Sequence, residues 1–250
     1  ELHLPAIIEQ FAVREQGFFL VVGPVGQGKT TTLAAIIEKI NQERSEHIIT
    51  IEDPIEYLFD NKRSLIDQRE VRIDTADFQG ALQSVFRQDV DVVMIGEMRT
   101  PDTISTAVTA AETGHLVLST LHTNNAVQTI DRVVDVFPTY QQSQVRQQLA
   151  NNMVGVVSQN LLRRADGSGR IAAFETLVNT PAVRNLIRES KTFQITSIVQ
   201  TGAKQGMMTL DQYLAALVKK GLVDRKEAIA RATNVKEFNA MMEETVPAGR

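Results

Sequence analysis

The feature that most constrains this chain is an eight-residue segment, GPVGQGKT, at Gly23 to Thr30. It has the form G-x-x-x-x-G-K-[ST] and follows the wholly apolar run Phe18 to Val22. A helical pattern of apolar residues, Leu33 to Ile40, comes after it. A strand, a glycine-rich turn and a helix in this order form a phosphate-binding loop, or P-loop. The segment therefore predicts an α/β domain that binds a nucleoside triphosphate, and a mere glycine-rich turn would not account for its flanks.

The residue types within this segment indicate a division of roles. Its glycines let backbone N–H groups surround phosphate oxygens, where the helix N-terminus adds partial positive charge. Lys29 is expected to reach the β- and γ-phosphates, and the Thr30 hydroxyl to bind Mg²⁺, so we expect ATP and Mg²⁺ as cofactors. The residues predicted to contact the nucleotide here are Gly23, Pro24, Val25, Gly26, Gln27, Gly28, Lys29, Thr30 and Thr31.

Three more short apolar runs follow, at Ile48 to Ile51, Val92 to Ile95 and Leu116 to Leu118. Runs this short and this apolar are typical of strands that are buried on both faces of a parallel sheet. A helix is expected before the last run, with Thr100 as its N-cap and Pro101 at its first position. The alternation of strands and helices predicts an α/β fold that binds its ligand at the carboxyl ends of the strands.

The pattern changes in the second half of the chain. Gln141 to Arg164 predicts one long, glutamine-rich helix, Ala165 to Arg170 a turn, and Ile171 to Val178 another strand. The remainder is helical in pattern. We therefore predict an α/β core over residues 1–180 and a helical subdomain over residues 181–250.

Two helices are expected within that subdomain. Leu210 to Val218 has one apolar face and ends before Gly221. Asp224 is predicted to cap the next helix, with Glu227 three residues later completing a capping box.

Acidic side chains follow two of the predicted strands. Glu97 comes directly after Val92 to Ile95, with glycine between, and is the candidate for supporting Mg²⁺. Glu52, Asp53 and Glu56 lie at the end of Ile48 to Ile51 and could polarise a water molecule. An acidic loop alone is a weak signal, because such loops usually serve only solubility.

Two of the four histidines, His115 and His122, flank the strand predicted at Leu116 to Leu118. Seven residues of extended chain separate them by roughly 20 Å, which excludes a shared metal site. His122, at the carboxyl end, could sense the γ-phosphate, although an isolated histidine is more often a core residue.

The composition excludes several function classes. The 250 residues include 26 Lys and Arg and 30 Asp and Glu, a net charge of −4, with no cysteine and no tryptophan. Thiolate metal sites are thus excluded, and nucleic-acid binding lacks both a basic field and stacking aromatics. No apolar run approaches the length of a membrane span, and the first residues lack the charged and apolar regions of a signal peptide, so none is expected.

Four segments together resemble the secretion-ATPase superfamily, and within it the type IV pilus retraction (PilT-like) ATPases. GPVGQGKT matches the Walker A motif, ITIEDPIEY (Ile49 to Tyr57) the Asp box, VVMIGEMR (Val92 to Arg99) Walker B, and AETGHLVLSTLHT (Ala111 to Thr123) the His box. PAVRNLIRE at Pro181 to Glu189 is similar to a box that marks retraction ATPases. The likeness covers nearly the whole chain.

The resemblance implies a RecA-like P-loop core and specific roles. Glu56 would be the general base, Glu97 would serve Mg²⁺, Lys29 and His122 would act in catalysis, and His115 would contact the nucleotide and help couple its state to conformation. Val25 and Gln27 replace the usual threonine and serine, at positions where we expect only the backbone to matter.

The same resemblance implies a homo-oligomer, a six-membered ring that hydrolyses ATP and drives pilus retraction. The ring would lie at the cytoplasmic face of the inner membrane, peripheral to it, beside a pilus platform protein and without nucleic acid. Relatives carry an N-terminal PAS-like domain, so the chain is expected to be their C-terminal ATPase part. Arginines acting across subunits are expected among Arg87, Arg99, Arg132 and Arg163.

Three alternatives remain open. The chain could serve pilus assembly or type II secretion within the same superfamily, although assembly-type relatives usually carry a four-cysteine zinc site. It could be a RecA-like nucleic-acid translocase, which DNA-stimulated hydrolysis would reveal. It could also be a non-catalytic nucleotide-gated adaptor, which Glu56 and Glu97 argue against.

Overall fold

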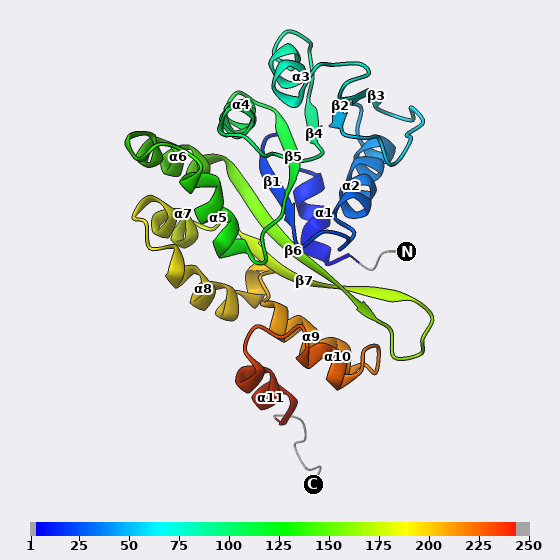
Figure 1. Cartoon of the computed structure of the whole chain (residues 1–250), viewed down its shortest axis with the longest axis vertical. Coiled ribbons are helices and arrows are strands. Elements are labelled where there is room, and N and C mark those ends of the chain that lie inside the picture. The colour runs from blue at the N-terminus through cyan, green and yellow to red at the C-terminus, as the bar shows by residue number, and fades with distance from the viewer. Residues whose placement is uncertain (1–3, 244–250) are drawn as a thin grey trace.

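A computed structural model describes residues 4–243 of the chain, which form a seven-stranded sheet with helices on both faces (Figure 1). The sheet order is β3-β2-β4-β5-β1-β6-β7, and only β7 runs antiparallel to its neighbour. The strands are β1 (Gly17–Val22), β2 (His47–Glu52), β3 (Leu65–Glu70), β4 (Val92–Ile95), β5 (Leu116–Leu121), β6 (Met153–Arg163) and β7 (Arg170–Val178).

The helices fill the connections and make up the C-terminal part. The α-helices are α1 (Ala6–Ala12), α2 (Lys29–Glu43), α3 (Phe78–Val85), α4 (Pro101–Glu112), α5 (Ala126–Asp135), α6 (Thr139–Asn152), α7 (Pro181–Arg188), α8 (Ile195–Thr201), α9 (Leu210–Lys219), α10 (Arg225–Ile229) and α11 (Val235–Glu243). Two short 3₁₀ turns, η1 (Thr192–Gln194) and η2 (Ala203–Gln205), flank α8. No helix within residues 4–243 combines the length and apolarity needed to cross a membrane.

Strand β1 lies inside the sheet, third from the β7 edge, and every one of its residues is apolar or glycine and fully buried. It pairs in parallel with β5 on one side and with β6 on the other. Ligand sites in such sheets form at the carboxyl ends of the strands, where the connections diverge. The loop that leaves β1 therefore emerges at that edge, between the ends of β5 and β6.

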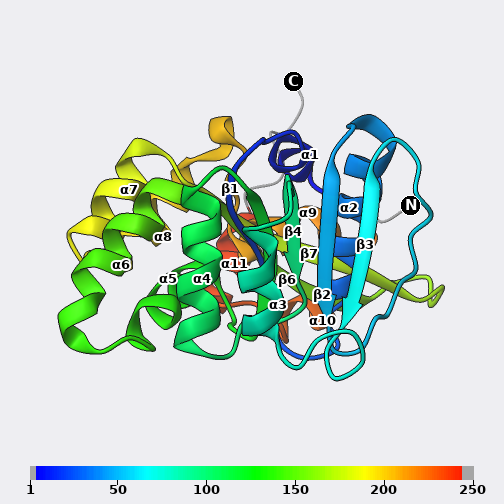
Figure 2. The ribbon, with the colours of Figure 1, turned by 90° about the horizontal axis from the view of Figure 1, so that it is seen from above.

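The two faces of the sheet pack against different helices, as Figure 2 shows from above. Alternate side chains of β1, such as Phe18 and Leu20, join a large apolar cluster with α3 to α8. The intervening side chains, Phe19 and Val21, join a second cluster with α1 and α2. This period-two division is what strands buried on both faces require. The four strands predicted in the first half, and the helix capped by Thr100, are confirmed.

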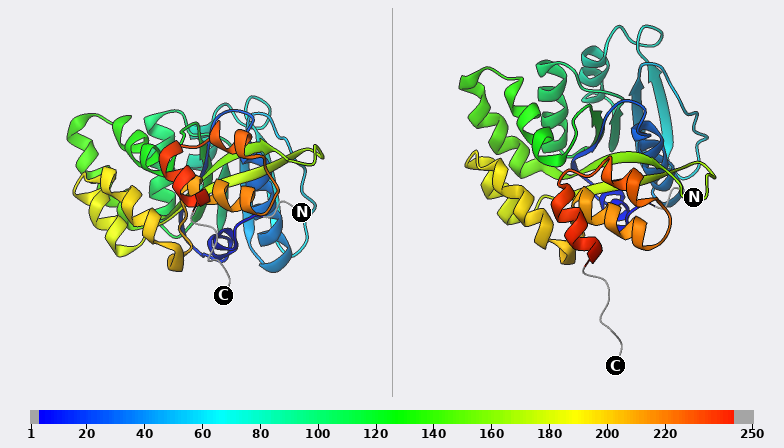
Figure 3. Two further views of the ribbon diagram at one scale, coloured as in Figure 1. Left: turned by 90° about the horizontal axis from the view of Figure 1, so that it is seen from below. Right: turned by 60° about the horizontal axis from the view of Figure 1, so that its bottom comes forward.

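A third apolar cluster joins α9, α10 and α11 to the outer parts of β6 and β7 (Figure 3). Leu214 and Phe238 are fully buried in it. By contrast, Val183 and Ile187 of α7 belong to the large cluster that packs on the sheet. The division of the chain at residue 180 stays a prediction, since α7 packs with the sheet and α9 with the β6–β7 pair.

The helix predicted over Gln141 to Arg164 is wrong in its second half. Helix α6 ends at Asn152, and the chain continues at once as β6. Asn179 donates from Nδ2 to the carbonyls of Ala150 and Met153, at 2.9 and 2.6 Å, which fixes this change of direction. The valines that follow favour a strand, and the place beside β1 removes them from water. The helix was predicted too long because helical periodicity does not show where a neighbouring strand takes up the chain.

Two smaller differences concern the edge strand β3 and the N-terminal caps of helices α9 and α10. Strand β3 was not predicted, because only one residue of this edge strand, Ile66, is buried and its sequence LIDQRE lacks an apolar run. Asp224 precedes α10 as predicted, but its side chain makes no capping hydrogen bond. The capping box lies instead at α9, where the Thr209 and Gln212 side chains each accept from the other residue's backbone N–H.

Candidate functional site

The predicted P-loop links β1 to α2, and its glycines adopt conformations that other residues resist. Gly26 and Gly28 have φ of 76° and 78°, in the left-handed region. A Cβ on Gly23 would lie 2.4 Å from the carbonyl oxygen of Gln159 in β6. The loop can therefore pass this close to the neighbouring strand only with glycine at position 23.

Lys29 opens α2 and turns its ammonium group into the loop. Nζ donates to the carbonyl oxygens of Gly23 and Pro24, at 2.9 and 3.0 Å, and contacts Nδ1 of His122 at 3.1 Å. Burial lowers the pKa of Lys29, and the carboxylates of Glu97 and Glu56 partly oppose that shift. The group that would meet a phosphate is thus held by two carbonyls of the P-loop and by His122, which follows β5.

The side chain of Gln27 has a structural role that the sequence analysis missed. Its Oε1 accepts from the backbone N–H of Leu161 at 2.6 Å, and its carbonyl accepts from Gln159 Nε2 at 2.7 Å. Gln159 also accepts from the hydroxyl of Thr32 at 2.6 Å. The expectation that only the backbone matters at position 27 is therefore wrong, because this side chain ties the P-loop to β6. No sequence signal joins residues so far apart.

Glu56 lies in the loop after β2 and faces the start of α2. The hydroxyl of Thr30 donates to its Oε1 at 3.3 Å. Next to this pair, the hydroxyls of Thr31 and Tyr57 are 2.8 Å apart. The chain thus brings the predicted general base against the predicted metal-binding hydroxyl, across 26 residues of sequence.

Glu97 follows β4, and its carboxylate contacts two nitrogen-bearing side chains, those of Arg99 and His122. Its Oε2 accepts from Arg99 Nη2 at 2.7 Å, and its Oε1 lies 3.3 Å from His122 Nε2. Partial burial opposes ionisation of Glu97, but Arg99 and His122 outweigh it and lower the pKa of this carboxyl. Because Lys29 has only donors, Nδ1 of His122 accepts from Lys29 and Nε2 donates to Glu97. His122 therefore bridges the P-loop lysine and the Walker B glutamate.

The other acids after β2 lie at different depths. Glu52 is 3% exposed, and its Oε1 accepts from the Thr50 hydroxyl at 2.8 Å and from Gln68 Nε2 at 3.3 Å. Its burial raises the pKa of the carboxyl. Asp53 is exposed and pairs with Arg72 at 3.3 Å. Glu52 is thus held in the floor of the site, whereas Asp53 turns to the surface.

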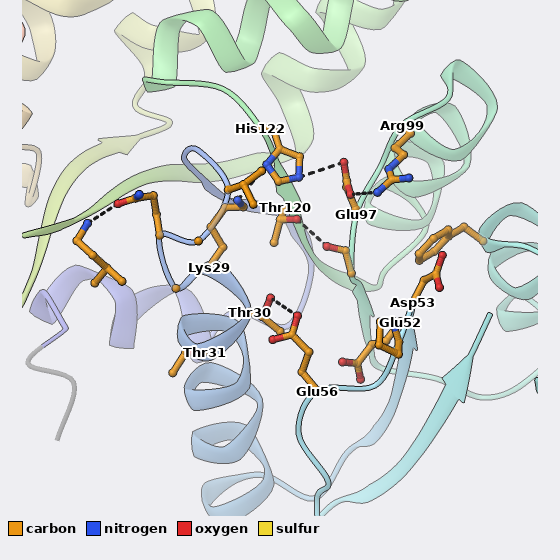
Figure 4. A pocket seen from close by; sticks show the side chains of 18 of the residues that line it. Lys29, Thr30, Thr31, Glu52, Asp53, Glu56, Glu97, Arg99, Thr120 and His122 are labelled. Carbon is orange, nitrogen blue, oxygen red and sulfur yellow. Dashed lines mark hydrogen bonds and ion pairs between the residues drawn. The ribbon is translucent and has the colours of Figure 1, made fainter. Parts of the chain in front are cut away.

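These side chains line one cavity of about 420 Å³ at the carboxyl edge of the sheet (Figure 4). P-loop residues form one wall, and Glu56, Glu97 and His122 lie across from it. The described residues that line the cavity include these of the predicted contacts: Val25, Gly26, Gln27, Gly28, Lys29, Thr30 and Thr31.

His115 does not belong to this group. His115 precedes β5, whereas His122 follows it, so the two lie at opposite ends of the strand. The Nδ1 atom of His115 lies 3.0 Å from the carbonyl oxygen of Ala110, and its ring packs edge-on against Phe86. It does not line the cavity, since parallel strands place their amino ends at the far edge of the sheet. The predicted contact of His115 with the nucleotide stays a prediction, and the lining of this cavity does not support it within one chain.

The four candidate arginines are also separated by the fold. Arg99 lines the cavity and pairs with Glu97. Arg132 borders a smaller hollow of about 140 Å³ that it shares with Arg99, Glu97 and His122. Among the described residues, Arg87 and Arg163 line neither of these two.

The donor set suits Mg²⁺ in combination with phosphate oxygens. Within residues 4–243 no cluster of three or more His, Asp or Glu side chains forms a cage that could hold a metal ion by itself. Mg²⁺ is usually bound by one or two protein oxygens, the phosphates of the substrate and water. The Thr30 hydroxyl and the Glu97 carboxylate, both on the cavity wall, supply such oxygens.

Comparisons with known proteins give independent information on the family and the fold. The model of a family described as type II/IV secretion system protein matches residues 4–240. The twitching motility protein of Neisseria gonorrhoeae is 52% identical over 234 residues, which are 94% of this chain and 63% of that protein. The type IV pilus retraction ATPase PilT of Pseudomonas aeruginosa is 48% identical over 238 residues, 95% of this chain and 69% of that protein.

A solved structure of the pilus retraction motor PilT with bound ADP superposes with a TM-score of 0.90 at 47% identity. The superposition covers 96% of this chain and 68% of that one. The predicted fold class, a RecA-like P-loop core with a C-terminal helical part, is confirmed by this match. The chain spans less than two thirds of the gonococcal relative.

Proposed function

Because this chain belongs to the type II/IV secretion system protein family, we propose that it is the ATP-hydrolysing part of a motor that retracts type IV pili. The observation that carries the proposal is the pairing across one cavity of Lys29 and Thr30 with Glu56 and Glu97. An anion-binding loop opposite two carboxylates is the arrangement that phosphoryl transfer to water requires.

The residues divide the work as follows. The amides of the P-loop and the ammonium of Lys29 bind the β- and γ-phosphates and stabilise negative charge in the transition state. Glu56 accepts the proton of the attacking water and orients its oxygen toward the γ-phosphorus. Glu97 and Thr30 would hold Mg²⁺, which, when bound, neutralises charge shared by the β- and γ-phosphate oxygens.

His122 gives the site a way to respond to a phosphate. Lys29 has three donors and already contacts two carbonyls and the imidazole of His122. A phosphate oxygen at Lys29 must replace one of these acceptors, and only His122 can leave by side-chain rotation. Phosphate binding is thereby linked to the His122–Glu97 contact and to α5, which begins four residues later.

Retraction, rather than assembly or another secretion role, is supported by the likeness to PilT over 95% of this chain and by the segment Pro181 to Glu189. That segment forms α7, whose Val183 and Ile187 are buried while Arg184 is exposed. As parts of the same proposal, the protein forms a six-membered ring at the cytoplasmic face of the inner membrane and acts on a pilus platform protein.

The test is ATP turnover by the purified chain and by single variants. We expect Lys29→Ala to weaken Mg-ATP binding and abolish turnover, and Glu56→Gln to lower kcat by about 10²- to 10⁴-fold while ATP still binds. Glu43→Gln is the matched control, because Glu43 pairs only with Lys39 on the exposed side of α2. Unchanged turnover in both site variants would overturn the assignment.

A further inference from the structure

Three residues separate His122 from the start of α5, and two side chains of the sheet hold this segment. The hydroxyl of Ser158 in β6 donates to the carbonyl of Asn124 at 2.9 Å. The carboxylate of Glu175 in β7 accepts from the backbone N–H of Ala126, the first residue of α5, at 2.8 Å. The backbone that follows His122 is therefore attached to the β6–β7 pair at two points.

Ser158 and Glu175 act as one support, because they lie directly opposite each other in the antiparallel β6–β7 pair. Opposite residues of such a pair project from the same face of the sheet. The next residue of β6, Gln159, projects from the other face and donates to a P-loop carbonyl at 2.7 Å. Neighbouring residues of β6 thus fix the segments that carry Lys29 and His122, whose side chains meet at 3.1 Å.

The N–H group of Ala126 depends on Glu175 for its acceptor. The first four N–H groups of a helix have no partner within the helix. The side chain of Asn125, the residue before α5, accepts from the N–H of Gln128 at 2.8 Å. Ala126 is fully buried. Without the carboxylate of Glu175 its N–H would stay unsatisfied and buried, unless the start of α5 moved.

Glu175 also faces the start of a second helix. The backbone N–H of Leu210, the first residue of α9, lies against the same carboxylate. Burial raises the pKa of Glu175, the N–H of Ala126 opposes that rise, and the charge of Asp211 adds to it. Two helix N-termini, each with partial positive charge, therefore converge on one buried carboxylate.

We propose that Glu175 is a positioning residue for ATP hydrolysis, which acts on His122 through the start of α5. With the backbone fixed there, the imidazole stays between Lys29 and Glu97 until a phosphate displaces it by side-chain rotation. Glu175 itself does not line the nucleotide cavity. The proposal rests on the proposed function, because that function gives His122 its part in hydrolysis.

The first test is steady-state ATP turnover by Glu175→Met, which puts an unbranched side chain without a strong acceptor in place of the carboxylate. We expect kcat to fall about fivefold, as the loss of one hydrogen bond of ordinary strength predicts, with the KM for ATP unchanged. Glu175→Gln keeps one acceptor oxygen and should retain most of the activity that the methionine variant loses. Ser158→Ala removes the other support and should also lower kcat.

Asp211→Leu is the matched control for Glu175→Met. Asp211 is likewise a buried carboxylate, and it accepts from the backbone N–H groups of Thr233 and Asn234, before α11, at 2.7 and 2.8 Å. Its loss should lower the stability of the protein without lowering kcat. An unchanged kcat in Glu175→Met, or an equal fall in Asp211→Leu, would overturn the proposal. Thermal unfolding shows which variants are folded, and if Glu175→Met is not, Ser158→Ala decides by the same criterion.

A spectroscopic measurement separates positioning from a general loss of structure. Long-range ¹H–¹⁵N spectra, recorded well above the usual pKa of histidine, show which ring nitrogen of each imidazole carries the proton. For His122 in the unmodified chain we expect one tautomer, with the proton on Nε2 toward Glu97. Glu175→Met should mix the two tautomers of His122 and leave the signals of His47 and His115 unchanged. A His122 signal that is the same in both proteins would contradict the proposal.

The two measurements also separate this proposal from the proposed function. If the unmodified chain did not hydrolyse ATP, the proposed function would fail, and the spectra would still decide whether Glu175 positions His122. If the chain hydrolysed ATP while Glu175→Met changed neither kcat nor the His122 signal, the positioning role alone would fail.

Discussion

At the scale of single residues, the site is a continuous chain of contacts from Lys29 through His122 to Glu97 and Arg99. Each link joins a donor to an acceptor, so the hydrogen-bonding roles of the four side chains depend on one another. Replacing any one of them changes the partners of the next. A double-mutant cycle across His122 and Glu97 would measure this dependence directly.

Glu52 allows a prediction about pH. Burial raises the pKa of its carboxyl above the usual 4.5, so the folded protein binds this proton more tightly than the unfolded chain does. This stabilisation is complete at low pH and is lost as the pH rises through the raised pKa. The contribution of Glu52 to the free energy of unfolding therefore falls as the pH rises above about 4.5, and we expect Glu52→Gln to remove it, so that the variant's stability falls less, or rises more, with pH than that of the unmodified protein.

Urea unfolding at several pH values measures the effect. Glu43→Gln, an exposed glutamate of α2, should keep the slope of the unmodified protein. Glu175, whose pKa burial also raises, accounts for part of the slope that remains. A slope that is identical with and without Glu52 would contradict the prediction.

At the scale of elements, β6 is the strand on which the site depends. It packs beside β1, holds Gln159 against the P-loop and contributes Leu161 to the wall of the nucleotide cavity. Its fit is tight at Gly155, where a Cβ would lie 2.5 Å from the Leu177 carbonyl and 2.7 Å from the ring of Phe11. Neither a backbone carbonyl nor a buried ring can move away easily.

We therefore expect Gly155→Ala to lower the free energy of unfolding by about 1–3 kcal/mol, as overpacking of a filled core does. Gly80→Ala makes the same chemical change in α3, where the nearest atom is the end of the Asp77 side chain at 3.3 Å. That control should be neutral or slightly stabilising, because alanine favours a helix over glycine. Equal unfolding midpoints in urea for the two variants would contradict the close packing at Gly155.

At the scale of the whole molecule, the nucleotide cavity lies at an open edge rather than in the interior. Arg99 is exposed beside it, and Arg132 borders the adjoining hollow. Among the described residues, Arg87 and Arg163 line neither of these two hollows. If a neighbouring subunit supplies a transition-state arginine, hydrolysis depends on assembly.

We accordingly expect ATP turnover per molecule to rise with protein concentration as larger species form. Turnover and light scattering measured across the same dilution series, with Mg-ATP present, test this. Arg87→Ala and Arg163→Ala should lower turnover without weakening ATP binding if either residue acts on the next subunit. Turnover that stays constant while the assembly dissociates would contradict the expectation.

Much of the fold around the site could be predicted from local features of the sequence. The P-loop and the strands around it were predictable, because glycines with left-handed φ and runs buried on both faces leave few alternatives. The same kind of local pattern gave a wrong prediction at residues 153–163, where a helix was expected. There the chain is a strand because it fits beside β1, and no helix-versus-strand pattern in the segment contains that information.

Contacts between distant segments were decided only by the tertiary structure. Thr30 meets Glu56, Gln27 meets Leu161, and His122 bridges Lys29 and Glu97, whereas His115 faces the other edge of the sheet. The sequence by itself determined which groups could do the chemistry, because that depends on residue type. The order of strands determined which of these groups meet, because a parallel sheet brings its carboxyl ends together and separates them from its amino ends.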